Sequence, residues 1–132
     1  MLDKQKVYIK EWLSFAKEDL DTANALLRGE YLYNRSICYH CQLAAEKDLK
    51  AYIIYLGLPL NKTHNLSKLI DQIKELDIDI LKLQSDVEVL TDYIVTARYP
   101  DDSEPITDEE SKLAFSVSEK INSYIKNKIF LQ

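Results

Sequence analysis

The sequence predicts an all-α protein: a single domain over residues 1–132, folded as an up-and-down bundle of four long helices plus one short helix. Apolar residues recur at intervals of three and four along most of the chain, which is the spacing of one helix face. Two glycines and three prolines leave few positions for the tight turns of β-structure. The hydrophobic fraction of 46% and the charged fraction of 30% are typical of a globular domain with a buried core.

The first helix is expected from about Asp3 to Arg28. Asp3 qualifies as its N-cap, and Gly29 stands where a C′ glycine ends a helix. The connection of residues 29–31 is short, so the next helix must fold back antiparallel. The apolar stripe consists of Leu13, Ala16, Leu20, Ala23 and Leu27, broadened by Trp12 and Phe15.

The second helix, Asn34 to Gly57, is expected to be the central helix of the bundle. Its apolar residues cover more of the circumference than one stripe, and such a helix is typically enclosed by others. Gly57 is suited to the C′ position, and Pro59 prevents continuation. The stripe consists of Cys38, Cys41, Ala45, Leu49, Tyr52 and Leu56, with Ile37, Ala44, Ala51 and Ile54 beside it.

A short helix and a fourth long helix follow. Thr63 or Asn65 caps the short helix, and Asp77 or Asp79 caps the long one, which ends at Arg98-Tyr99-Pro100. The short helix has an apolar face of Leu66, Leu69, Ile70 and Ile73. The long helix has a stripe of Ile80, Leu83, Val87, Leu90, Ile94 and Ala97.

The last helix opens with the strongest local signal in the chain. Thr107-Asp108-Glu109-Glu110 is a capping box, with acidic residues in the turn where the helix dipole favours them. Val117, Ile121 and Ile125 continue the apolar face of this helix.

The charge balance narrows the function. A formal net charge of −5 argues against general coating of DNA or RNA, because neutralising phosphates needs a surplus of Lys and Arg. A local basic pocket is still compatible with this charge. No segment approaches the ~18 apolar residues of a membrane span, and the N-terminus lacks an apolar core of signal-peptide length. A cytoplasmic protein without membrane contact is expected.

The segment Cys38-Tyr39-His40-Cys41 has the residue types of a metal or redox motif. A zinc site needs about four ligands, and His64 is the only other histidine. Both cysteines lie on the core stripe, which indicates reduced thiols packed in the core, with neither a metal nor a cofactor.

Arg35 and His40 have the R-x4-H spacing of a candidate catalytic pair. The arginine would bind phosphate and the histidine would carry out acid–base chemistry, a combination suited to RNA cleavage. On one helix, however, five positions turn the two side chains roughly 140° apart. They could act together only across a dimer interface or after a kink; otherwise a solvated arginine and a half-buried histidine are expected.

Two further groups are candidates for binding. Glu46 and Lys50 form an i,i+4 pair beside Lys47, on the side of the helix away from the core stripe, which is typical of a solvated surface pair. Arg98-Tyr99-Pro100 ends a helix with a guanidinium suited to phosphate or carboxylate and with a ring that could stack on a base. The alternative for Arg98 is that it satisfies the carbonyls of the helix end.

Four motifs in order resemble one known family over nearly the whole chain. They are the first helix with Trp12, Ala16, Asp19-Leu20 and Ala23; Cys41–Ala51 (CQLAAEKDLKA); Lys62–Leu66 (KTHNL); and Tyr93 leading to Arg98–Asp101 (RYPD). Together they are similar to the HEPN domain (higher eukaryotes and prokaryotes nucleotide-binding) in its stand-alone prokaryotic form.

This resemblance implies a helical bundle that forms a homodimer. It also implies binding of a nucleotide or an RNA phosphate, pairing with a minimal nucleotidyltransferase in a toxin–antitoxin or stress-response role, or both. Glu46, Lys50, His64, Arg98 and Tyr99 match the recurring polar positions of this subgroup, so the resemblance assigns them to nucleotide or partner binding.

Two alternatives remain open. The first is a metal-independent ribonuclease that uses His40 with Arg35 or Arg98. In ribonuclease members of the family the arginine and the histidine lie late in the bundle, and no histidine follows Arg98 here. Binding is therefore favoured over catalysis. The second alternative is a non-catalytic helical adaptor of the tetratricopeptide type, against which the lack of a 34-residue repeat counts.

Overall fold

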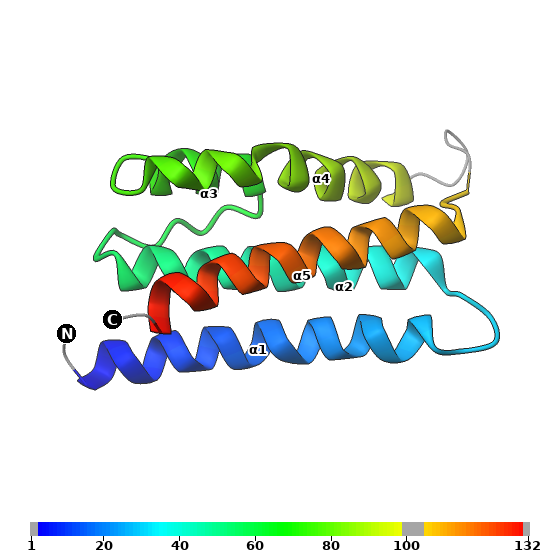
Figure 1. The fold of residues 1–132 in the computed structure, drawn as a ribbon, viewed down its shortest axis with the longest axis horizontal. Helices are drawn as coiled ribbons and strands as arrows, with labels where there is room; N and C mark the ends of the chain where they lie inside the picture. Colours follow the sequence, from blue (N-terminus) through cyan, green and yellow to red (C-terminus); the bar gives the residue numbers. More distant parts are fainter. Residues whose placement is uncertain (1–2, 99–104, 131–132) are drawn as a thin grey trace.

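The computed structural model describes residues 3–98 and 105–130, without the side chains of residues 93–98 and 130. Within these residues the chain forms five α-helices, of which α3 is short, and a 3₁₀ helix, η1, that leads directly into α4 (Figure 1). The predicted all-α bundle of four long helices and one short helix is confirmed. The elements are α1 (Asp3–Leu27), α2 (Asn34–Tyr55), α3 (Leu66–Ile73), η1 (Ile78–Leu83), α4 (Gln84–Arg98) and α5 (Asp108–Phe130).

The helix α2 is the centre of the bundle, as its wide apolar surface predicts. It contacts each of the other four α-helices, and Ile37, Leu49 and Ile53 are fully buried. Gly57 adopts a positive φ of 77°. The Leu58 amide then donates to the Ile53 carbonyl at 3.1 Å, and the Gly57 amide donates to the Ile54 carbonyl at 3.0 Å. This pair of hydrogen bonds is the Schellman motif, which a glycine makes possible at this position.

Both ends of α1 differ in detail from the prediction. Asp3 is the first described residue of the helix and lies in its first turn, where the helix dipole favours an acidic side chain. Gly29 does not adopt a positive φ. The helix instead closes with two tight turns, in which the Arg28 amide donates to Ala25 and the Gly29 amide donates to Leu26, both at 3.2 Å.

The segment before α4 is the main departure from the predicted helices. Asn65 caps α3 by accepting from the Lys68 amide at 3.1 Å. Asp77 accepts from the Asp79 amide at 3.2 Å and caps η1, so the α-helix itself begins only at Gln84. Ile80 and Leu83, three positions apart, are both buried, because a 3₁₀ helix places such residues on one side. The side chains of Ile94 and Ala97 lie outside the described residues.

The helix α5 begins with the predicted capping box. The Thr107 hydroxyl accepts from the Glu110 amide and the Glu110 carboxylate accepts from the Thr107 amide, both at 3.1 Å. Polar links then join α5 to α2, among them Ser111 to Asn34 at 2.6 Å, Ser118 to the Cys41 carbonyl at 2.8 Å, and Asn122 to Asp48 at 3.0 and 3.1 Å. Their α2 members are spaced by seven residues, so the links fix the register of two helices that run in the same direction (Figure 1).

Asp77 joins the connection between α3 and η1 to α2 and α5 at one end of the bundle. Its Oδ2 accepts from the hydroxyls of Tyr52 and Tyr124, both at 2.8 Å, and the Lys128 ammonium lies 3.7 Å away. Burial opposes ionisation of Asp77, but these donors outweigh it and lower the pKa of the carboxyl below its usual value. The residue therefore holds the connection between α3 and η1 against α2 and α5.

Asp48 gives a testable consequence of the α2–α5 contact. Burial raises the pKa of this carboxyl to about 7, although Asn122 and Lys126 act in the opposite direction. The folded protein thus binds the proton more tightly than the unfolded chain does, so the free energy of unfolding should fall as the pH rises from about 4 to about 7. We expect Asp48→Asn to remove this loss. Between pH 5 and pH 8, the free energy of unfolding of the variant should therefore rise relative to that of wild type by on the order of 2 kcal/mol.

Urea denaturation at pH 5 and pH 8 measures both free energies of unfolding. Asp71→Asn is the matched control, because Asp71 is exposed and pairs only with Lys74 among the described residues. The control should follow the wild-type pH dependence. An Asp48→Asn variant that keeps the full wild-type slope would contradict the assignment.

Candidate functional site

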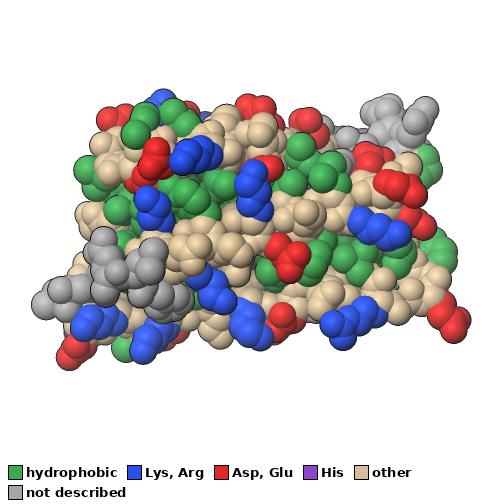
Figure 2. Space-filling view, viewed as in Figure 1, with side chains coloured by type: hydrophobic (Ala, Val, Ile, Leu, Met, Phe, Trp, Pro, Cys, Tyr) green, Lys and Arg blue, Asp and Glu red, His purple; other side chains and the backbone are tan. Residues whose placement is uncertain are grey.

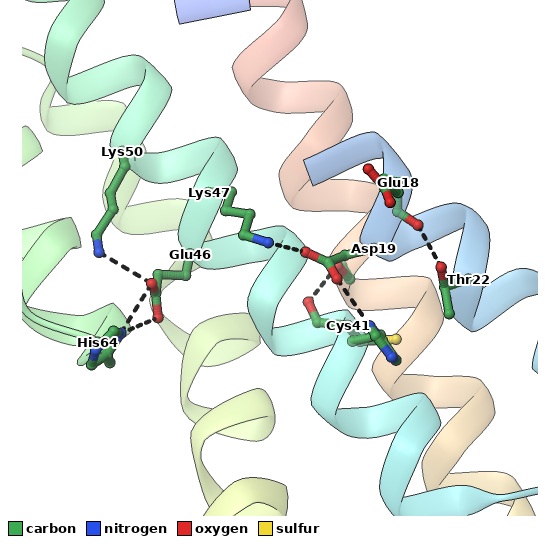
Figure 3. Close-up of polar contacts among 10 residues, drawn as sticks. Glu18, Asp19, Thr22, Cys41, Glu46, Lys47, Lys50 and His64 are labelled. Carbon is green, nitrogen blue, oxygen red and sulfur yellow. Dashed lines mark hydrogen bonds and ion pairs between the residues drawn. The ribbon is translucent and has the colours of Figure 1, made fainter. Parts of the chain in front are cut away.

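Two polar clusters lie along α2, on its sides that face α1 and the connection of residues 57–65 (Figure 3). The Glu46 cluster consists of Glu46, Lys50 and His64. The Lys50 ammonium lies 3.1 Å from Glu46 Oε2, and His64 Nδ1 lies 3.1 Å from both carboxylate oxygens. The ring of Trp12, from α1, lies 5.7 Å from the Lys50 ammonium. One carboxylate therefore serves a lysine and a histidine, and an indole covers the lysine.

Glu46 and Lys50 are buried, whereas a solvated surface pair was expected. Glu46 and Lys50 are only 5% and 4% exposed, whereas the His64 side chain is 82% exposed. The i,i+4 pair is formed as predicted, but α1 and the connection of residues 57–65 cover it. Because a buried charge without a partner is costly, Glu46 and Lys50 depend on each other for their place in the fold.

The Asp19 cluster consists of Asp19 from α1 with His40 and Lys47 from α2. Asp19 is nearly buried; His40 Nδ1 lies 2.9 Å from its Oδ1, and the Lys47 ammonium lies 2.5 Å from its Oδ2. The Lys47 ammonium also lies 6.0 Å from the ring of Phe15, which is 52% exposed. Asp19 thus orients a half-exposed imidazole through one nitrogen and holds a lysine beside an exposed aromatic ring.

The predicted candidates divide into those that the fold brings together and those that it does not. Glu46, Lys50 and His64 are in direct contact, although they lie on two different segments. Arg35 is exposed, and no hydrogen bond or ion pair joins it to His40, which contacts Asp19 instead. Arg98 is the last residue of α4, and its side chain and all of Tyr99 lie outside the described residues.

The cysteines are packed in the core as expected. Cys38 and Cys41 are buried free thiols, and the Cys38 sulfur lies 3.9 Å from the Ser111 hydroxyl. Burial raises the pKa of Cys38 to about 11 and raises that of Cys41 further, so neither thiol ionises readily. Across residues 3–98 and 105–130, no group of three His, Cys, Asp or Glu side chains is placed to hold a metal ion.

Asp19 and Lys47 were not among the predicted site residues. Asp19 nevertheless carries a signal in the sequence, because it stands between Ala16 and Ala23 at the three- and four-residue steps of the apolar stripe. An acidic residue at such a position must meet a cation or a donor on the facing helix. Lys47 lacks a comparable signal, since a lysine beside an i,i+4 pair is ordinary on any exposed helix.

The surface charge outside these clusters is mixed. On the face with α5 in front, basic and acidic side chains are mixed over α4 and α5, whereas basic side chains gather along α1 (Figure 2). This distribution agrees with the net charge of −5. Within the described residues, no helix has the length and apolar character needed to cross a membrane.

Comparison with known proteins places the chain in a family. Residues 9–128 match the family model described as the HEPN domain. The fold is similar to TT1696 from Thermus thermophilus, with a TM-score of 0.72 and 26% identity over 91% of this chain and 97% of that chain. It is also similar to ST0689, an archaeal HEPN homologue, with a TM-score of 0.73 and 21% identity over 92% of this chain and 97% of that one. No curated protein matches the sequence. Since the HEPN match spans most of its length, the chain belongs to the HEPN domain family.

Proposed function

We propose that this protein is a binding module for a nucleotide or an RNA phosphate, and that the α1–α2 face with the Glu46 cluster is its site. The observation that carries the proposal is the contact of the exposed His64 with Glu46, on the helix whose Lys47 holds its ammonium beside the exposed ring of Phe15. Such a face combines cations for phosphate with rings for a base, which is the combination that nucleotide-binding surfaces use.

The cations suit the phosphate part of the ligand. Lys50 is buried and its charge is compensated by Glu46, so it holds the carboxylate that His64 contacts. Lys47 pairs with Asp19, is partly exposed, and has donors left for a phosphate. Charge-assisted hydrogen bonds from lysine to phosphate are among the strongest polar contacts in proteins.

The aromatic residues of α1 suit the base. Phe15 and Tyr8 are exposed, and Tyr8 packs edge-on against Trp12 at 6.0 Å between ring centroids. Stacking of a base on such rings contributes about 1–3 kcal/mol and depends little on sequence. Arg98 and Tyr99 are proposed as a separate contact to phosphate and base, because α4, which ends at Arg98, lies on the other side of α2 from α1 (Figure 1).

The module is proposed to act as a homodimer and to pair with a minimal nucleotidyltransferase. Several large apolar side chains are exposed on α1 and at the turn into α2, including Val7, Tyr31 and Tyr33. Aromatic residues of this kind are enriched at the centres of protein interfaces. This support is separate from the charged clusters, so the pairing role and the binding role can stand independently.

We expect ATP or GTP, at about ten times its Kd, to raise the Tm of the wild type by about 4 °C. Lys47→Gln should reduce this shift to about 1 °C, because it removes a cation that the phosphates contact. Arg98→Ala, compared in the same assay, tests the separate contact proposed at the end of α4. Differential scanning fluorimetry with and without nucleotide gives the shift for each variant against its own unliganded Tm.

Lys17→Gln is the matched control. Lys17 pairs with Asp21 on α1, is 71% exposed, and lies about 160° around the helix from Phe15. This control should keep the wild-type shift. If neither nucleotide moves the Tm of the wild type, small nucleotides are not the ligand of this face.

The Asp19 cluster favours a second candidate, the metal-independent ribonuclease. Asp19 accepts from one ring nitrogen of His40, which fixes the imidazole and leaves the other nitrogen for proton transfer. His40 would take the proton of an RNA 2′-hydroxyl, whose oxygen then attacks the adjacent phosphorus. The 5′-oxygen leaves with a proton from water, and Arg35 or Arg98 would bind the phosphate.

This candidate predicts RNA cleavage without added metal, in the presence of a chelator. His40→Ala should lower the cleavage rate by about 10²–10⁴-fold, the range for loss of a general base. Arg35→Ala and Arg98→Ala, compared in the same assay, identify the arginine. A wild-type protein that leaves single-stranded, structured and transfer RNA intact would remove this candidate.

A further inference from the structure

The Glu46 cluster contains two nitrogen groups for one carboxylate, and only one of them can change its charge near neutral pH. Lys50 and Glu46 are both buried, and the ammonium lies 3.1 Å from Oε2, so their charges compensate each other. His64 reaches the same carboxylate from the solvent side. An imidazole gains and loses its proton between about pH 5 and pH 8. The net charge of the cluster is therefore +1 with His64 protonated and zero with His64 neutral.

Hydrogen bonds of neighbouring residues hold the connection that carries His64. The Leu58 amide donates to the Ile53 carbonyl at one end of the connection, and Gln72 Nε2 donates to the Pro59 carbonyl at 2.6 Å. At the other end Asn65 caps α3. A change in the protonation of His64 therefore alters the charge at a defined place on the surface.

His64 contacts the charged groups of its own cluster. From α2 it faces Glu46 and, through Glu46, Lys50. On the α1 side of Lys50, the uncharged ring of Trp12 lies 5.7 Å from the ammonium. Lys62 in the same connection and Lys68 on α3 are exposed basic residues near it in sequence.

We propose that phosphate binding at the Glu46 cluster is linked to uptake of a proton by His64. A phosphate group is attracted to the cluster when its charge is +1 and not when it is zero. By linkage, bound phosphate favours the protonated imidazole by the same factor. Binding of nucleotide is thus tighter at pH 6 than at pH 8. The inference rests on the proposed function, because it requires that phosphate binds at this cluster.

Isothermal titration calorimetry with ATP, on the full chain at pH 6 and pH 8, tests the linkage. Wild type should bind ATP more weakly at pH 8 than at pH 6. This change in Kd, divided by the change in Kd measured for His64→Gln, should be roughly tenfold. This ratio is needed because terminal phosphates also take up protons in this range. His64→Gln retains a donor to Glu46 but cannot become charged, so it should bind weakly at both pH values. Because His64 is exposed, neither this variant nor the next should disturb the fold.

His64→Lys places a permanent charge at the same position and should bind tightly at both pH values. His40→Gln removes the only other imidazole of the chain and should keep the wild-type pH dependence. Titrations of the wild type in buffers of different ionisation enthalpy should show net proton uptake at pH 7 in excess of that for His64→Gln.

The measurements distinguish a failure of the linkage from a failure of nucleotide binding. If ATP binds to the wild type with the pH dependence of His64→Gln, the linkage is wrong while the binding site stands. If His40→Gln loses the pH dependence and His64→Gln keeps it, the proton is taken up at the Asp19 cluster and the proposal is overturned. If ATP binds at neither pH, the linkage and nucleotide binding are both rejected.

Discussion

The structure depends on the enclosure of one helix. Because α2 contacts every other α-helix, the polar side chains that it carries meet neighbouring elements before they meet water. A buried polar group without a hydrogen bond costs on the order of 1–3 kcal/mol, so each neighbour must supply a matching partner. Asp48 accepts a hydrogen bond from Asn122 on α5, Tyr52 donates one to Asp77, and Lys47 donates one to Asp19 on α1. The polar residues of α2 thus decide where the other elements pack.

These partners differ in kind from one side of α2 to the other. Toward α5 the links at Asn34 and Cys41 include hydrogen bonds to serine hydroxyls. Among the described residues, the carboxyl groups there, Asp48 and Asp108, accept from asparagine amides rather than pairing with cations. Toward α1 and the connection of residues 57–65 the partners are charged, and several of them reach the surface. A neutral, saturated contact serves packing, whereas a charged and partly exposed one can still accept a ligand. This contrast, together with the aromatic rings of α1, supports the proposal of a site on the α1–α2 face.

The sequence was sufficient to predict the features that depend on local spacing. Periodicity in three and four residues located the helices, and the wide apolar surface of Asn34–Gly57 identified the central helix. Gly57 and the Thr107–Glu110 capping box act within a few residues of their own helix ends, so their geometry was confirmed. The start of α4 was misplaced, because the apolar residues Ile80 and Leu83 satisfy the spacing of an α-helix and of a 3₁₀ helix alike.

The features that depend on tertiary contact could not be predicted in this way. An i,i+4 pair such as Glu46 and Lys50 has the same spacing whether it is solvated or buried, and what covers it lies on α1 and on a connection without regular structure. The place of His64 on Glu46 likewise requires the path of that connection. The contact between His40 and Asp19 joins two helices across 21 positions of sequence. Only the family resemblance grouped Glu46, Lys50 and His64 before the fold was known.

The central claim is that the charged, partly exposed side of α2 is a ligand site and not only a packing contact. The most direct measurement is the change in backbone amide chemical shifts when ATP is added to ¹⁵N-labelled protein. The account predicts that the largest changes fall in residues 46–50 and 62–65 and on the facing turn of α1 around Trp12. Changes confined to the Asp77 end of the bundle, or saturating changes that leave residues 46–50 unaffected, would contradict it.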